Sequence, residues 1–107
     1  MEVLLIYVVY GYVELYLPYC SSLKEKRKTV HGIVSRIRKR FNVSICEVEF
    51  HDLWQRSGLG FSAVSHNSPG IGLITNSIKE TFLNYSADTE ITVFDYNIIN
   101  RPKCQEM

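Results

Sequence analysis

The strongest periodic pattern in the chain runs from Ser22 to Phe41 and predicts a helix. Apolar residues recur there every three or four positions, so one face of the helix would be apolar. These residues are Leu23, Val30, Ile33, Val34, Ile37 and Phe41. Ser22 and Glu25 have the spacing of a capping box, in which each side chain satisfies a backbone amide at the start of a helix. The sequence therefore predicts a helix that begins just after Ser22.

Four stretches rich in β-branched and aromatic residues predict strands. They are Val3 to Leu17, Val43 to Phe50, Leu59 to His66 and Glu90 to Ile99. In the first stretch, Val13, Leu15 and Leu17 alternate with polar and tyrosine positions, and we expect these three to face the helices. Gly11 indicates a bulge or a close approach of another chain segment.

The second predicted strand has two dissimilar faces. One face carries Val43, Ile45, Glu47 and Glu49, and the other carries Ser44, Cys46, Val48 and Phe50. The pattern leaves open which face meets the helices, although the mostly small second set would suit close helix packing.

A second helix is predicted after the third strand. Ser68 would cap it and Pro69 would occupy its first position. Its apolar stripe consists of Ile71, Ile74, Ile78, Phe82 and Tyr85.

The predicted order β-α-β-β-α-β indicates an α+β protein with the ferredoxin-like fold. Right-handed crossovers and one hairpin then give a four-stranded antiparallel sheet with both helices on one face. We expect a single domain over residues 1–100 and a polar tail over residues 101–107. The other sheet face would stay open, with Tyr12 and Tyr16 projecting from it. An open apolar face is often covered by a second copy, so these two tyrosines are candidates for a homodimer contact.

Charge changes this picture, because the first predicted helix holds most of the basic residues. They are Lys24, Lys26, Arg27, Lys28, Arg36, Arg38, Lys39 and Arg40, against one acid, Glu25. The formal net charge of the whole chain is only +1, so the acids lie elsewhere and the molecule is polarised. A one-sided basic helix is typical of phosphate binding. An ordinary solvated helix face is the alternative.

The basic residues do not all lie on the same side of this helix. At about 100° per residue, three lysines point away from the apolar stripe and two pairs of arginines flank it. The outward lysines are Lys24, Lys28 and Lys39, and the flanking pairs are Arg27 with Arg38 and Arg36 with Arg40. Lys26 instead projects close to the stripe, so its stem would snorkel or its ammonium would meet a carboxylate.

Other features narrow the range of functions. The three cysteines are an odd number without zinc-ligand spacing, which favours a reducing cytoplasm and predicts neither disulfides nor a metal site. No apolar run is long enough to span a bilayer, and the N-terminus is a poor signal peptide. The sequence gives no reason to expect a cofactor. The histidines and cysteines form no catalytic pattern, so we expect a protein that is not an enzyme.

Asp52, Trp54 and Arg56 lie in the connection between the second and third strands. Trp54 would stack on a base while Arg56 contacts a phosphate, or Trp54 would be a packing anchor for the hairpin. We also expect Asp52 or Glu49 to pair with Lys26 or Arg27, which would tie this connection to the helix.

These same segments resemble the YlxP-like family of small bacterial proteins, which is classed as a domain of unknown function. The residues that carry the resemblance are Ser22 to Arg27, Arg40 to Ser44, Glu47 with Val48, Asp52, Trp54 to Arg56, and Leu59 with Gly60. The resemblance covers about Gly11 to Ile99 and implies a ferredoxin-like fold without an established activity. Genes of this family often lie beside those for ribosome-binding factor A and a translation initiation factor, which implies a link to the ribosome or to RNA.

We therefore expect a non-enzymatic binding protein that contacts RNA or a ribosomal particle. The predicted contacts are Lys24, Arg27, Lys28, Arg36, Arg38, Lys39 and Arg40. The alternative is an interaction protein that dimerises through its open sheet face and binds a protein partner.

Overall fold

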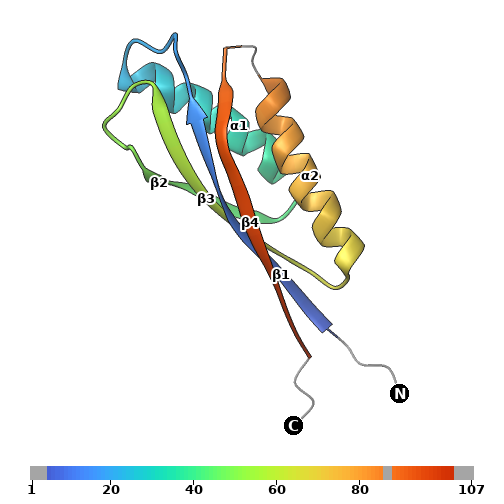
Figure 1. The fold of residues 1–107 in the computed structure, drawn as a ribbon. Coiled ribbons are helices and arrows are strands. Elements are labelled where there is room, and N and C mark those ends of the chain that lie inside the picture. The colour runs from blue at the N-terminus through green and yellow to red at the C-terminus, as the bar shows by residue number, and fades with distance from the viewer. Residues whose placement is uncertain (1–4, 86–87, 103–107) are drawn as a thin grey trace.

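The computed structural model describes residues 5–85 and 88–102 and has the predicted element order (Figure 1). The elements are β1 (Leu5–Tyr16), α1 (Leu23–Arg40), β2 (Val43–Glu49), β3 (Arg56–Ser65), α2 (Ser68–Tyr85) and β4 (Glu90–Pro102). The predicted β-α-β-β-α-β arrangement is confirmed. The start of the first predicted strand and residues 103–107 of the predicted tail lie outside the described residues.

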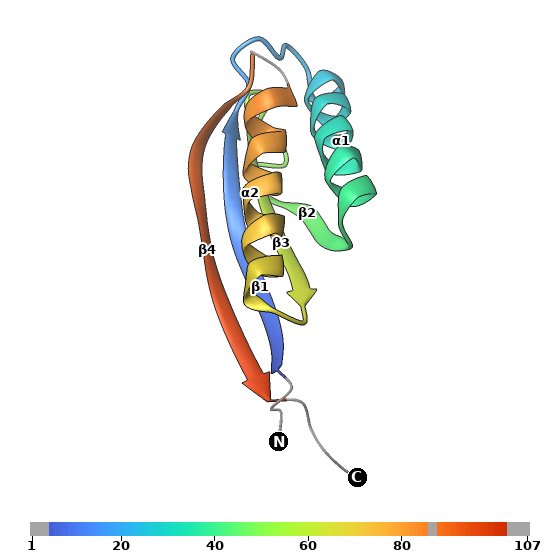
Figure 2. The same cartoon turned by 90° about the vertical axis from the view of Figure 1, so that its right-hand side faces the viewer.

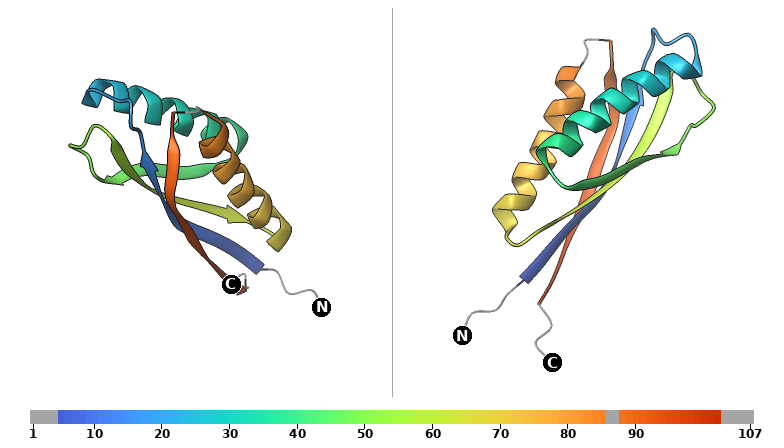
Figure 3. Two further views of the ribbon diagram at one scale, coloured as in Figure 1. Left: turned by 45° about the horizontal axis from the view of Figure 1, so that its top comes forward. Right: turned by 180° about the vertical axis from the view of Figure 1, so that it is seen from behind.

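The four strands form one antiparallel sheet in the order β2-β3-β1-β4. Both helices cover the same face of this sheet, and the opposite face is open (Figure 2). A view from behind shows the two helices in front of the strands (Figure 3). The fold is therefore ferredoxin-like, with one layer of strands and one layer of helices.

The core lies between the sheet and the helices. Val13 and Leu15 of β1 are fully buried there, as the alternation predicts. They are joined by Ile33 and Ile37 of α1 and by the apolar stripe of α2, of which Phe82 is the largest fully buried member. A row of aromatic rings crosses the same face, with Phe61, Phe94 and Tyr96 in sequential ring contact at 5.9 and 6.0 Å.

Gly11 is a point of close approach, which is one of the two predicted roles. A Cβ at this position would overlap the backbone carbonyl of Asp95 and the ring of Phe61. The paired strands β1 and β4 keep a regular register through Gly11, and their irregularity lies between Glu14 and Leu15. The absence of a side chain therefore lets the aromatic row lie flat across β1.

Several predicted boundaries differ from the structure. Strand β3 begins at Arg56 rather than Leu59, and β4 continues to Pro102, so the first two residues of the predicted tail are strand. Helix α2 is capped by Asn67, whose side-chain oxygen accepts a hydrogen bond from the Gly70 amide at 2.7 Å. The predicted cap, Ser68, is instead the first helical residue. Asn67 takes this place because its side chain reaches the third amide of the helix.

The face of β2 that meets the helices is the one with Val43 and Ile45, both of which are buried. Small residues would have allowed closer packing, but these two bury more apolar surface against α1.

Candidate nucleic-acid interface

Ser22 caps α1 as predicted, but the return bond of Glu25 goes to the residue before the cap. The Glu25 amide donates to the Ser22 hydroxyl at 3.1 Å. The Glu25 carboxylate reaches back and accepts from the backbone amide of Ser21 at 2.7 Å. The Ser21 amide and hydroxyl hold the pKa of Glu25 below its ordinary value, so the carboxylate remains ionised at the positive end of the helix dipole.

The solvent side of α1 carries an array of exposed cations. Lys24, Arg27 and Lys28 form its N-terminal half, and Arg36, Lys39 and Arg40 form its C-terminal half. At about 1.5 Å per residue, this array spans about 24 Å along the helix axis. In the described part of the chain, none of these six residues takes part in an ion pair. Their charges therefore remain available to an external anion.

The C-terminal half of the array borders a shallow hollow between the two helices. Arg36, Lys39 and Arg40 line it from α1, and Glu80, Thr81 and Asn84 line it from α2. The guanidinium of Arg36 stacks over the Tyr85 ring at 4.8 Å, which fixes its position at the surface. Tyr85 fits here because Gly32 leaves room for its hydroxyl on the facing turn of α1.

Arg38 differs from the other predicted contacts, because it has a structural role. Its Nη2 atom donates a hydrogen bond to the backbone carbonyl of Ile45 at 2.8 Å. Since β2 is an edge strand, this bond satisfies a carbonyl on its free edge. Arg38 stays exposed, but its guanidinium is already oriented by the sheet.

Lys26 is the one basic residue of α1 that is completely buried, with a side-chain exposure of 0%. Its ammonium lies 3.0 Å from the Glu47 carboxylate, which is 19% exposed. It also donates to the backbone carbonyls of Phe50, His51 and Arg56 at 2.7, 3.1 and 3.3 Å. The expectation of a carboxylate partner is confirmed, but the predicted partners Asp52 and Glu49 are wrong.

The sequence does not identify Glu47 as a site residue, because no local pattern shows that this acid lies on the core side of its strand. It is oriented by Ser57, whose hydroxyl donates to it at 2.6 Å. The lysine, the acid and the three carbonyls join the two sequence blocks Ser22 to Arg27 and Asp52 to Arg56. Lys26 therefore links α1 to the β2–β3 connection. The sequence predicted such a link but expected Asp52 or Glu49 to supply the carboxylate.

The three residues predicted in this connection have separate environments. Trp54 is 52% exposed and lies outside the core, so the structure leaves part of its surface accessible. Asp52 is exposed and forms no hydrogen bond or ion pair within the described ranges. Arg56 lies 4.0 Å above the Phe50 ring and 2.8 Å from the Glu14 carboxylate, so its exposed guanidinium already has partners within the chain.

Glu14 belongs to a polar cluster on the open sheet face. Besides Arg56, it accepts hydrogen bonds from Thr92 at 3.0 Å and from Tyr12 at 3.2 Å. The Tyr12 hydroxyl also donates to Glu49 at 2.8 Å. Burial raises the pKa of the Tyr12 phenol, and its hydrogen bonds to Glu49 and Glu14 add to this effect. Tyr12 is thus held within its own chain, whereas Tyr16 is partly exposed on the same face.

The polar cluster predicts a pH effect on stability. The hydrogen bond from Arg56 is the main reason that the pKa of Glu14 lies below its ordinary value of 4.5. The stability that this interaction adds is present above pH 4.5 and is lost as the pH falls through the lower pKa of the folded state. We expect the melting temperature of Glu14→Gln to fall less steeply than that of the wild type on acidification below this pH. Circular dichroism melts at a series of pH values test this, and parallel curves would contradict it.

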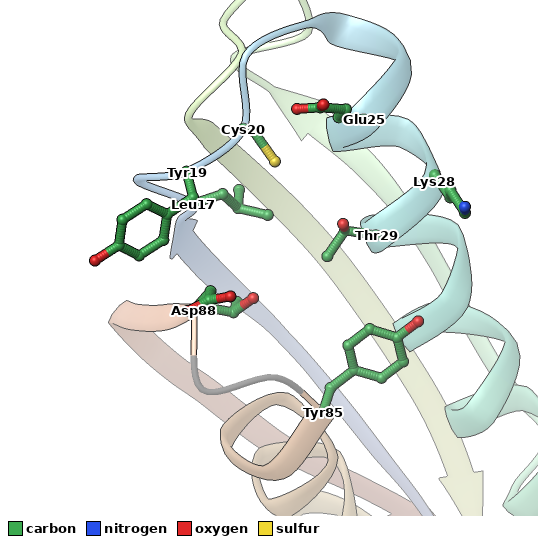
Figure 4. A pocket seen from close by; sticks show the side chains of 9 residues that line it. Leu17, Tyr19, Cys20, Glu25, Lys28, Thr29, Tyr85 and Asp88 are labelled. Carbon is green, nitrogen blue, oxygen red and sulfur yellow. The ribbon is translucent and has the colours of Figure 1, made fainter.

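A hollow of about 430 Å³ lies at the N-terminal end of α1 and is lined by residues from the loop after β1, from α1, from the end of α2 and from the two residues before β4 (Figure 4). The side chains of Cys20 and Thr29, which both line this hollow, point toward one another. Burial raises the pKa of the Cys20 thiol, and the Glu25 carboxylate adds to this effect. The thiol is therefore protonated at neutral pH, which is unlike an activated nucleophile.

Within residues 5–85 and 88–102, no group of three or more histidine, cysteine or acidic side chains is placed to hold a metal ion. Neither α1 nor α2 is both long and apolar enough to cross a membrane.

Comparison with known proteins places the chain in a family. Residues 8–96 match the family described as "Protein of unknown function (DUF503)". The "Uncharacterized protein YlxP" of Bacillus subtilis (strain 168) is 50% identical over 45 residues, which are 42% of this chain and 49% of that protein. The match thus spans about half the length of this curated relative. A de novo designed protein, Foldit4, aligns over 91% of this chain and 98% of its own, with 11% identity and a TM-score of 0.49. The family match covers most of the chain, including the Lys26 link and the basic helix, and the protein therefore belongs to this family of unknown function.

Proposed function

We propose that this protein is a non-enzymatic binding protein that contacts structured RNA, free or within a ribosomal particle, through the exposed cations of α1. The observation that supports this most is the segregation of charge. Six exposed cations of one helix form no hydrogen bond or ion pair within the described residues, whereas Lys26, Arg38 and Arg56 have partners in the protein. A rigid helix that presents cations over about 24 Å contacts several successive phosphates at once.

The distribution of acids supports the same side of the molecule. Glu14 and Glu49 lie in the polar cluster of the open sheet face, and Asp95 lies opposite Tyr12 on that face. Their charges repel phosphates from the sheet. These charges support RNA binding on the helix layer, where Glu80 of α2 is the acid beside the C-terminal half of the array. Trp54 is exposed and available to stack on an unpaired base.

The test is the binding of a fluorescently labelled RNA hairpin by the purified protein over a range of salt concentrations. We expect the variant Lys24→Glu/Lys28→Glu/Lys39→Glu to lose binding, and the slope of log affinity against log salt to become shallower by about 3, or about 1 for each lysine. All three side chains are exposed, so the melting temperature should change little.

The matched control is Lys24→Arg/Lys28→Arg/Lys39→Arg, which keeps the three charges and should keep the affinity and the slope. If the wild type fails to bind the hairpin at low salt, or if the glutamate variant binds as the wild type does, RNA binding through α1 is excluded.

A second candidate function is the binding of a protein partner by the open sheet face. Val64, Val8 and Ile99 lie opposite one another across β3, β1 and β4 and form an apolar row on that face. Purified ribosomal subunits separate the two candidates. Association that survives the glutamate substitutions on α1 but is lost in Val64→Lys would support the protein partner, and the reverse result would support RNA.

A further inference from the structure

The two edges of the sheet differ in how well they are protected. Strand β2 is short, has an irregularity between Glu47 and Glu49, and has Arg38 bonded to a carbonyl on its edge. Strand β4 runs from Glu90 to Pro102, and Figure 2 shows its outer edge without a neighbouring described element. From Val93 onward its pairing with β1 is regular. Long regular edges of this kind are templates for pairing with another strand.

The side chains of β4 are also unusual for an exposed edge. Edges that stay unpaired usually carry lysine, an internal proline or a bulge in their exposed part. Between Val93 and Ile99, β4 has no lysine, proline or bulge, and Asp95 is its one charged residue; apart from Asp95 and Asn97 it carries β-branched and aromatic residues. On the helix side, the aromatic row ends at Tyr96, which is 43% exposed, and Ile98 beside it is 48% exposed. The row thus stops at the edge with its last ring uncovered.

We propose that β4 pairs in antiparallel fashion with β4 of a second copy of this chain, so that two sheets join into one of eight strands. This contact goes beyond the proposed function and does not rest on RNA binding. In this proposal the second copy contacts the edge of the sheet, whereas the sequence predicts a dimer through the open face.

The sequence of β4 selects one register for this pairing. Residues directly opposite one another in an antiparallel pair lie on the same face of the sheet. Side chains alternate between the two faces, so the two-fold axis that relates two copies of β4 must place one residue opposite its own counterpart. An axis at Tyr96 places the two Tyr96 rings together, Phe94 opposite Ile98, and Val93 opposite Ile99. An axis at Asp95 would place two carboxylates opposite one another, and an axis at Asn97 would place Ile99 opposite Asp95. Only the first register places every apolar residue between Val93 and Ile99 opposite another apolar residue, and it places Asp95 opposite Asn97.

A face-to-face dimer is less favourable for a physical reason. Two open faces in contact would bury Glu14, Glu49 and Asp95 against their own copies, and like charges are costly to bury together. Tyr12, which was a candidate for that contact, already donates to Glu14 and Glu49. The edge contact leaves this cluster in water and extends the apolar row of Val64, Val8 and Ile99 into the second copy.

The register makes a sharp cross-linking test possible. Directly opposed residues of an antiparallel pair have Cα atoms about 4.5–5.5 Å apart, which matches the span of a disulfide. In a background with Cys20, Cys46 and Cys104 replaced by serine, Tyr96→Cys should form a covalent dimer under mild oxidation. Asn97→Cys, which lies diagonal to its own counterpart, should cross-link poorly.

Analytical ultracentrifugation and a third cysteine variant complete the experiment. The wild type should show a concentration-dependent dimer, and Tyr96→Lys/Ile98→Lys should be monomeric with an unchanged far-ultraviolet spectrum. A third variant, Val64→Cys, reports contact between open faces. A wild type that is monomeric at all concentrations, or cross-linking by Val64→Cys without cross-linking by Tyr96→Cys, would overturn the proposal.

Discussion

Replacing Lys26 by methionine should lower the free energy of unfolding by about 3–5 kcal/mol, the cost of breaking a buried ion pair. The methionine side chain fills a similar volume but cannot donate. The Glu47 carboxylate would lose its partner, and the carbonyls of Phe50, His51 and Arg56 would lose a donor. Because buried acceptors without donors are costly, the β2–β3 connection should loosen as well. Urea unfolding measures the free energy, and hydrogen exchange measures protection in residues 50–56.

The matched control is Lys24→Met, which removes an exposed lysine two residues away on the same helix. Its effect should stay within about 0.5 kcal/mol, as for most surface substitutions. If Lys26→Met were no more destabilising than this control, the Lys26 link would not be a determinant of stability. Glu47→Leu should be milder than Lys26→Met, since it leaves the three carbonyl bonds of Lys26 in place.

The second large effect is expected at Gly11. Gly11→Ala would place a Cβ against the carbonyl of Asp95, the ring of Phe61 and the Cβ of Tyr96. A carbonyl in a paired strand cannot move without disturbing the β1–β4 ladder, so we expect a loss of about 1–3 kcal/mol or more. The measurement is the urea concentration at the midpoint of unfolding for the wild type and the variant. A lower midpoint with an unchanged slope of free energy against urea concentration reports a loss of stability.

A second glycine provides the control for this experiment. A Cβ added at Gly72 in α2 meets no atom within 4 Å. Gly72→Ala should therefore raise the stability by up to about 1 kcal/mol, because alanine favours a helix interior. Equal effects of the two substitutions would show that the close approach at Gly11 is not a constraint on β4. Loss of the covalent Tyr96→Cys dimer in the Gly11→Ala background would further link this contact to the edge geometry.

The sequence by itself determined the features that follow from local geometry. The period of α1 predicted its start at Leu23 and the burial of Ile33 and Ile37. The same period placed Arg36 and Arg38 on opposite flanks of the apolar stripe, and they contact Tyr85 of α2 and Ile45 of β2, respectively. A helix turns by a fixed angle per residue, so these directions are encoded without knowledge of the rest of the fold.

The tertiary structure decided which groups meet across elements. The alternating pattern placed Glu47 and Glu49 on the same face of β2. The irregularity between them pairs Glu47 with Leu59 and Glu49 with Gly58, so the two carboxylates lie on opposite faces of the sheet. Glu47 therefore meets Lys26 in the core, and Glu49 meets Tyr12 on the open face. One extra residue in a strand reverses the direction of every side chain after it, and no local pattern in this sequence marks that residue.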